Sequence, residues 1–220
     1  MRFALCIALF ALSAAAFTQA AGRTNPDLGR VLWEPPDWNF PENVKATVPE
    51  EMLTTLRVSN YEIKLEETSI NDVRQRLGGV IGRKGDAGDA SEWLCFRGAD
   101  ANGRWVLWLE NGEIDGDFVG SFQWQRLSNR DVLDGRCRVL GKGDSLVQLP
   151  LSLGLGIRSS EVLKRLGPPT SRDGERLVYV HEHEAGEARA GDPFISSNIV
   201  VVHIRNGLVW AIQASKTISD

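Results

Sequence analysis

The sequence predicts an α+β protein of two tandem units, each a short helix packed on a small antiparallel β-meander, with both sheets forming one continuous open face. One observation is a repeated helix signal: residues 67–80 (ETSINDVRQRLGGV) match residues 156–170 (GIRSSEVLKRLGPPT), so that Leu77 corresponds to Leu166. The other is that three strand-like runs follow each copy. Together they indicate a duplicated helix-and-strands unit.

Both expected helices carry start and stop signals. Apolar residues recur at helical spacing in each, and both helices are about ten residues long, which is marginal for an isolated helix in water. Each helix is therefore expected to lie on a sheet. The expected caps and stops are Thr68 or Ser69 with Gly78 in the first helix, and Ser159 or Ser160 with Gly167 in the second.

The strand-like runs place a tight turn in each unit. Asn206-Gly207 separates two apolar runs and is a strong hairpin signal, and Asn111-Gly112 occupies the corresponding place in the first unit. The expected strands are 92–97, 104–110 and 118–127 in the first unit, and 176–183, 198–205 and 208–215 in the second.

Alternation along these strands assigns one face to the helices and leaves the other open. In the second unit Val178 and Val180 are expected beneath the helix, with Trp210 on the same side. The open face then holds the likeliest contacts for a protein partner, because tryptophan, tyrosine and arginine are typical interface anchors. Two alternatives are a one-residue slip in strand phase and burial of the rings by the N-terminal segment. The expected contacts are Trp93, Trp108, Tyr179 and Arg205.

The N-terminus has the layout of a secretory signal peptide, expected over residues 1–20: one arginine, an apolar run and small residues. A proline-rich segment follows over residues 21–58, ahead of units at 59–140 and 141–220. Part of this segment is expected to lie across the folded body because it contains Trp33 and Trp38; a tail that binds a partner is the alternative. The expected location is the periplasm.

Two cysteines remain after the signal peptide, Cys95 and Cys137. An even pair in an exported protein favours a disulfide, with two unpaired buried thiols as the alternative. The net charge is −4, and no basic block is interleaved with aromatics, so nucleic acid is not expected as a partner. No later segment is apolar enough to span a bilayer, so the mature chain is expected to have no membrane span.

Catalytic and metal-binding signals are weak. His181, His183 and His203 all fall in the second unit, and plain exposed histidines are favoured over a zinc site. The acidic turn at 113–117 lacks the spacing of a calcium loop. No nucleophile or metalloprotease motif is present, so the chain is expected not to be an enzyme and to need no cofactor or metal.

The residues Gly156-Ile157, Val162 and Leu166-Gly167-x-Pro169, followed by a three-stranded meander, resemble the repeat of the BamE (SmpA/OmlA) family of outer-membrane assembly lipoproteins. Two such units in tandem look like the fold of the β-lactamase inhibitor protein family. That resemblance implies a concave sheet that grips an enzyme.

The sequence and this resemblance together predict a secreted or periplasmic, non-catalytic protein-binding module. In its sharpest form the module is an inhibitor or immunity protein against an envelope-directed or secreted enzyme. The alternative is a structural accessory protein in cell-envelope or outer-membrane assembly. The identity of the partner and the oligomeric state stay open.

Overall fold

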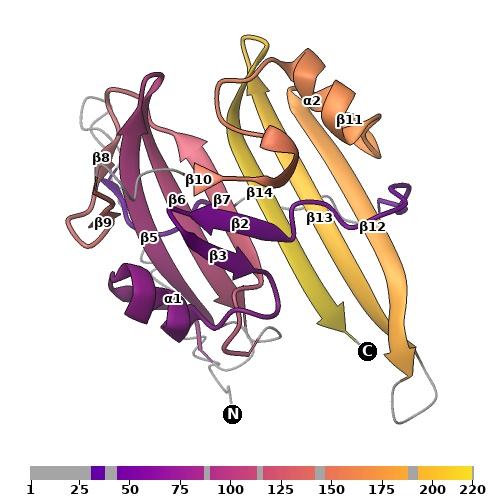
Figure 1. Ribbon diagram of the computed structural model, residues 1–220, viewed down its shortest axis with the longest axis horizontal. Coiled ribbons are helices and arrows are strands. Elements are labelled where there is room, and N and C mark those ends of the chain that lie inside the picture. Colours follow the sequence, from indigo (N-terminus) through magenta and orange to yellow (C-terminus); the bar gives the residue numbers. More distant parts are fainter. Residues whose placement is uncertain are drawn as a thin grey trace, which may run out of the picture.

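The computed structural model describes residues 31–37, 44–86, 90–112, 116–141, 147–187 and 193–219. Most of these residues are in β-strands (Figure 1). The helical elements among them are α1 (Ile70–Leu77), α2 (Ser159–Leu166) and the 3₁₀ turn η1 (Pro150–Ser152). The expected signal peptide lies outside the described residues.

One nine-stranded sheet organises the molecule, and two small sheets flank it. The strand order in the large sheet is β11 (Ser171–Asp173), β12 (Arg176–Glu187), β13 (Pro193–Arg205), β14 (Leu208–Ser219), β7 (Ser121–Arg126), β6 (Gly103–Gly112), β5 (Ser91–Asp100) and β4 (Ile81–Lys84), and β9 (Arg138–Val139) pairs parallel to β5. The small sheets are β10 (Val147–Gln148), β2 (Thr55–Val58) and β3 (Tyr61–Lys64), and the parallel pair β1 (Val31–Leu32) and β8 (Val132–Leu133).

The predicted fold class is therefore wrong: the chain is mostly β and does not divide into two helix-plus-meander units. The decisive contact is the antiparallel pairing of β7 with β14, which runs from Ala211 opposite Gln125 to Ser215 opposite Ser121. This pairing satisfies the main-chain donors and acceptors that would otherwise form two exposed sheet edges. A single large sheet results, in place of two small ones.

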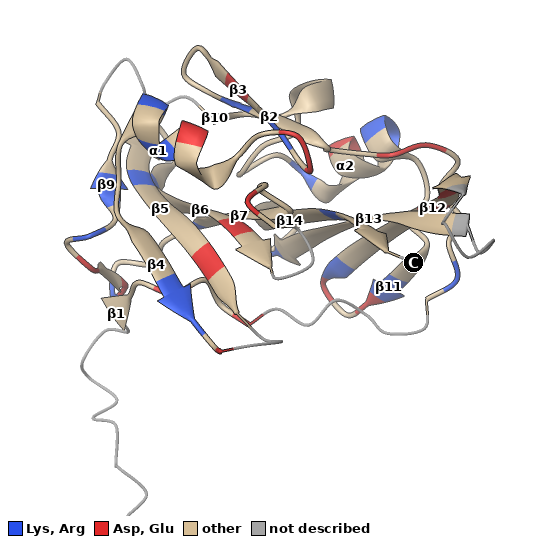
Figure 2. Cartoon of the chain, turned by 90° about the horizontal axis from the view of Figure 1, so that it is seen from below, with Lys and Arg blue, Asp and Glu red and all other residues tan. Residues whose placement is uncertain are grey.

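The two helices and the β2–β3–β10 sheet cover one face of the large sheet, called here the helix face (Figures 1 and 2). Helix α1 buries Ile70 and Val73 there, and α2 buries Val162 and Leu166. The main core lies between these layers and includes Phe96, Leu107, Trp105, Phe122 and Trp124.

Both helices end as the sequence predicts, but only the first begins as predicted. The Ser69 side chain accepts hydrogen bonds from the main-chain N–H groups of Asn71 and Asp72 in the first turn of α1. Gly78 ends this helix with a φ of 76°. Helix α2 also ends at a glycine, Gly167, with a φ of 78°. Its N-cap is Arg158, without a side-chain hydrogen bond, so the expected serine cap is wrong.

The opposite face of the sheet is not open, because the chain's own N-terminal segment covers part of it (Figure 2). We call residues 31–37 and 44–53 the N-terminal strap. At one end Leu32 joins a buried cluster beneath β5 and β6, and further along Val44 and Ala46 pack on the valines of β12 and β13. A proline-rich segment suits this position, since it lies extended on a sheet without joining its ladder.

Two further local predictions differ from the structure. Asn111-Gly112 belongs to β6 and forms no tight turn, whereas Asn206-Gly207 forms the turn expected of it, with φ values of 53° and 76°. In β12 the phase is reversed: Tyr179 belongs to the core of the helix face and Val178 to the cluster on the opposite face. Strand β12 has apolar side chains on both of its faces, so an alternating pattern could not show which of them point toward the helices.

Candidate protein-interaction site

The strap buries two of the four expected contact residues. Trp93 and Trp108 lie on the face opposite the helices, but their exposed fractions are only 1% and 0%. The Trp33 ring meets Trp93 edge-on with centroids 5.8 Å apart, and the Trp108 indole N–H donates to the Trp33 carbonyl at 3.1 Å. The expected exposure of these rings is therefore wrong, because a segment remote in sequence covers them.

A carboxyl group lies beside these rings. Glu110 accepts a hydrogen bond of 2.7 Å from the Gln123 side-chain amide, while Gln123 also donates to the Pro36 carbonyl of the strap at 3.3 Å. Burial raises the pKa of Glu110 to about 7, against an ordinary value of 4.5. The nearby Lys84, which is paired with Asp37 of the strap at 2.9 Å, opposes this rise.

This carboxyl group is expected to give the stability of the fold a specific pH dependence. Since the pKa of Glu110 is higher in the folded state, folding favours the protonated form and stability falls as pH rises from about 4.5 to about 7. Glu110→Gln is expected to remove this fall. The difference in unfolding free energy between the variant and the native chain is then expected to be about 1–3 kcal/mol more favourable to the variant at pH 8 than at pH 4. Urea denaturation at both pH values measures the difference.

The matched control is Glu62→Gln, at an exposed carboxyl group on β3. It is expected to keep the pH dependence of the native chain. Equal pH dependence in Glu110→Gln and the native chain would show that Glu110 is hydrated in the folded state.

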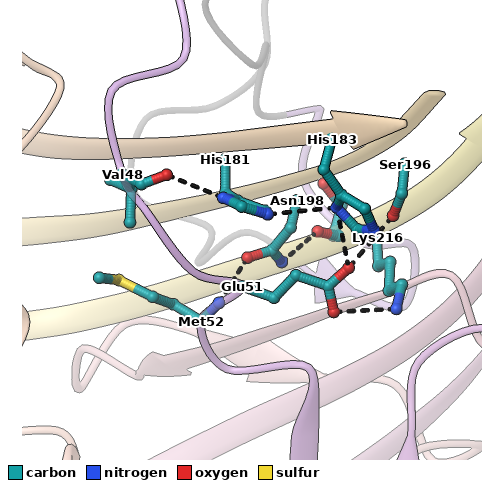
Figure 3. A network of polar contacts seen from close by, with 9 residues as sticks. Val48, Glu51, Met52, His181, His183, Ser196, Asn198 and Lys216 are labelled. Carbon is teal, nitrogen blue, oxygen red and sulfur yellow. Dashed lines mark hydrogen bonds and ion pairs between the residues drawn. The ribbon is translucent and has the colours of Figure 1, made fainter. Parts of the chain in front are cut away.

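A second group of contacts fixes the strap where it reaches the helix face (Figure 3). The Glu51 carboxylate accepts hydrogen bonds from Lys216 at 2.9 Å and from the buried hydroxyl of Ser196 at 3.1 Å, and lies 3.9 Å from His183. Burial raises the pKa of Glu51, but Lys216, Ser196 and His183 together hold it below its ordinary value. Glu51 is thus a charged anchor between the strap and two strands.

Main-chain groups of the strap complete this anchor. The Met52 N–H donates to the Asn198 side chain at 2.7 Å, and the Val48 N–H donates to the Val180 carbonyl at 3.1 Å (Figure 3 shows the former). The Val48 carbonyl lies 2.8 Å from Nδ1 of His181. The strap therefore passes around the edge of β12, from the opposite face to the helix face.

Tyr179, the third expected contact, is also buried, with an exposed fraction of 1%. Its ring lies in the core of the helix face, and its hydroxyl donates to the Gly167 carbonyl at the end of α2 at 3.3 Å. Burial raises its pKa to about 12. The expected exposure of Tyr179 is wrong because the phase of β12 is reversed.

Arg205, the fourth expected contact, is exposed at the end of β13. The register of β13 and β14 shifts just after His203, which leaves Trp210 as an extra residue, and such bulges re-aim a side chain. The Trp210 ring lies beneath the Arg205 guanidinium, 4.3 Å from its central carbon, and edge-on to His203 at 5.6 Å. Burial lowers the pKa of His203 to about 4, so this ring is neutral at neutral pH.

Arg205 and Trp210 border a hollow of about 400 Å³ at one end of the large sheet. It lies between the turn that joins β5 to β6, the end of β7 and the turn that joins β13 to β14 (top of Figure 1). The Arg126 side chain is held in it by two hydrogen bonds from its guanidinium to Asp100, at 2.7 and 2.8 Å. We call this hollow the hairpin-end groove; its lining includes Asn102, Arg126, Leu127, Arg205, Leu208 and Trp210.

The groove has the chemistry of a protein contact surface. Leu208 is 44% exposed at its rim and adds apolar surface beside the Trp210 ring. Tryptophan and arginine, which line this groove, are residue types that dominate binding energy at protein interfaces. Strand alternation predicts Trp210 on the helix side of the sheet. This prediction is wrong because the bulge that turns Trp210 outward leaves no mark in the alternating pattern.

The histidines form no metal site in the described part of the chain. His181 and His183 approach to 3.2 Å, but His203 pairs with Arg176 at the other end of β12. Among the described residues, no three His, Cys, Asp or Glu side chains lie close enough to hold a metal ion. Part of the acidic turn at 113–117 lies outside the described residues.

Comparison with protein-family models, with curated proteins and with solved structures finds no match for this chain. The resemblance noted in the sequence therefore depends on its short motif alone. Within the described residues, no helix is long and apolar enough to cross a membrane.

Proposed function

We propose that this chain is a non-catalytic protein-binding module of the periplasm or another exported compartment, and that it contacts its partner through the hairpin-end groove. The observation that carries the proposal is the exposed Arg205–Trp210 stack, with Leu208 beside it. In its most specific form, the module is an inhibitor or immunity protein against a secreted or envelope-directed enzyme.

The stack supports binding because its geometry is already fixed in the free chain. Trp210 is held between Arg205 and the neutral His203 ring, so little side-chain entropy remains to be lost when a partner covers it. Arg126 is likewise held in place by Asp100. Ordered aromatic and arginine side chains bind a complementary surface at lower entropic cost than mobile ones.

The disulfide supports the choice of compartment. Cys95 and Cys137 are bonded, and both are almost completely buried. Structural disulfides persist in oxidising compartments and are rare in a reducing cytosol.

A capture experiment tests the proposal. The chain from Ala21 onward is immobilised, envelope and secreted extracts of the producing cells are passed over it, and the retained proteins are identified. The native chain is expected to retain a soluble hydrolase, and Arg205→Glu is expected to lose at least nine-tenths of it, since charge reversal at an interface centre is costly.

Arg74→Glu is the matched control, because Arg74 is an exposed arginine on α1, at the other end of the molecule (Figure 1). It is expected to retain the hydrolase as the native chain does. Equal retention by Arg205→Glu and the native chain would contradict the groove as contact surface. Retention of an outer-membrane barrel or a wall fragment in place of a hydrolase would favour a role in envelope assembly.

A further inference from the structure

A second hollow, of about 440 Å³, lies at the end of β5 on the face opposite the helices. The short strands β8 and β9 border it, in the upper left of Figure 1. We call it the β5-end hollow, and its lining includes Arg97, Ala99, Arg104, Leu127, Leu133 and Val139. It shares Leu127 with the hairpin-end groove but none of the residues of the Arg205–Trp210 stack.

The walls of this hollow are mainly apolar and are held in place. Val139 is 56% exposed at its rim, and Leu133 packs against the buried cluster that contains Trp108. The Cys95–Cys137 disulfide ties β5 to the loop that carries β8 and β9. The hollow is therefore built before any ligand arrives, as small-molecule sites usually are.

Two positive charges line the same hollow. Arg97 is half-buried, and its Nε is fully buried with no hydrogen-bond partner among the described residues. Arg104 donates from Nη2 to the carbonyls of Ser128 and Asp131, at 2.7 and 3.2 Å. In the described ranges no ion pair joins either guanidinium to a carboxylate. The hollow therefore combines mainly apolar walls with two guanidinium groups, a combination that favours an anionic ligand with an apolar body.

We infer that the β5-end hollow binds a small monocarboxylate with an apolar body, of the size of a medium-chain fatty acid or an aryl-alkanoic acid. The two oxygens of a carboxylate match the two terminal Nη groups of Arg97. Arg104 adds a second positive charge, although its Nη2 already donates to two loop carbonyls. The apolar body would lie against Leu127, Leu133 and Val139. Neither Arg205 nor Trp210 lines this hollow.

Titration of the chain from Ala21 onward with decanoate tests the inference, by calorimetry and by backbone amide chemical shifts. Saturable binding is expected below the concentration at which decanoate forms micelles, with shifts confined to the residues around Arg97, Leu127 and Val139. Arg97→Met is expected to weaken binding at least tenfold, since it keeps the apolar stem but loses the charged fork. Decanol, which has no charge, is expected to bind at least tenfold more weakly than decanoate.

Controls separate this site from the hairpin-end groove. Arg205→Gln is expected to leave decanoate binding unchanged, and Arg97→Met to leave the capture of a protein partner unchanged. If Arg97→Met fails to fold, Arg104→Gln, at an exposed position, takes its place with an expected loss of at least threefold. Absence of saturable binding, equal affinity for decanol, or native affinity in a folded Arg97→Met chain would each overturn the inference. Phenylbutyrate in place of decanoate distinguishes an aryl acid from an alkyl one.

Discussion

Replacing Trp108 by alanine is expected to lower the free energy of unfolding by about 3–5 kcal/mol, the usual cost of removing a fully buried tryptophan. The ring is 0% exposed and packs with Leu32 and Trp93, and the substitution also deprives the Trp33 carbonyl of its donor. Urea denaturation of the native and variant chains measures this loss. Because Trp108 holds the strap, the variant is also expected to be cleaved faster by protease within the strap.

Trp210→Ala is the comparison for this substitution. Trp210 is only half-buried at the hairpin-end groove, so its loss is expected to cost less than half as much stability. A Trp108→Ala chain with the native unfolding midpoint would show that the ring faces solvent and that the strap does not cover the sheet.

Removing the disulfide is expected to cost about 4 kcal/mol of folding free energy, the chain-entropy value for a loop of this length. The bonded residues are 42 positions apart, and both lie in the cluster beneath the strap. The paired variant Cys95→Ala/Cys137→Ala is therefore expected to melt well below the native chain. Calorimetric melting of both proteins gives the difference.

Reduction of the native chain provides the control for this variant. The reduced protein is expected to melt near the paired variant, whereas reductant is expected to leave the melting of the variant itself unchanged. A native chain whose melting temperature is unaffected by complete reduction would contradict a structural role for this bond.

Local signals in the sequence identified the elements that depend on neighbours along the chain. The helices α1 and α2, the glycines that end them and the Asn206-Gly207 turn follow from capping, periodicity and turn chemistry. The pairing of Cys95 with Cys137 followed from compartment and count. The β2–β3 hairpin was missed although Leu56, Val58 and Ile63 alternate there, because the prolines before it suggested irregular structure.

Contacts between remote segments were beyond those local signals. The two expected sheets were predicted to share one face, but nothing in the local pattern of β7 indicates that Ser121 pairs with Ser215 and joins them into one hydrogen-bonded sheet. The error in the site has a related cause. The proline-rich segment was expected to lie across the folded body, but local signals did not show that it covers Trp93 and Trp108. Only Arg205 depends on a local turn, and it is the one expected contact that is exposed.

Site-specific photo-crosslinking in the producing cells most directly tests whether the hairpin-end groove is the contact surface. A photoreactive residue at Leu208 lies at the rim of the groove, and one at Val80, which is 51% exposed beside the edge strand β4, is the control. The groove position is expected to crosslink one protein, and Arg205→Glu in the same chain is expected to abolish that crosslink. The same protein crosslinked from Val80 and not from Leu208 would contradict the proposed contact surface.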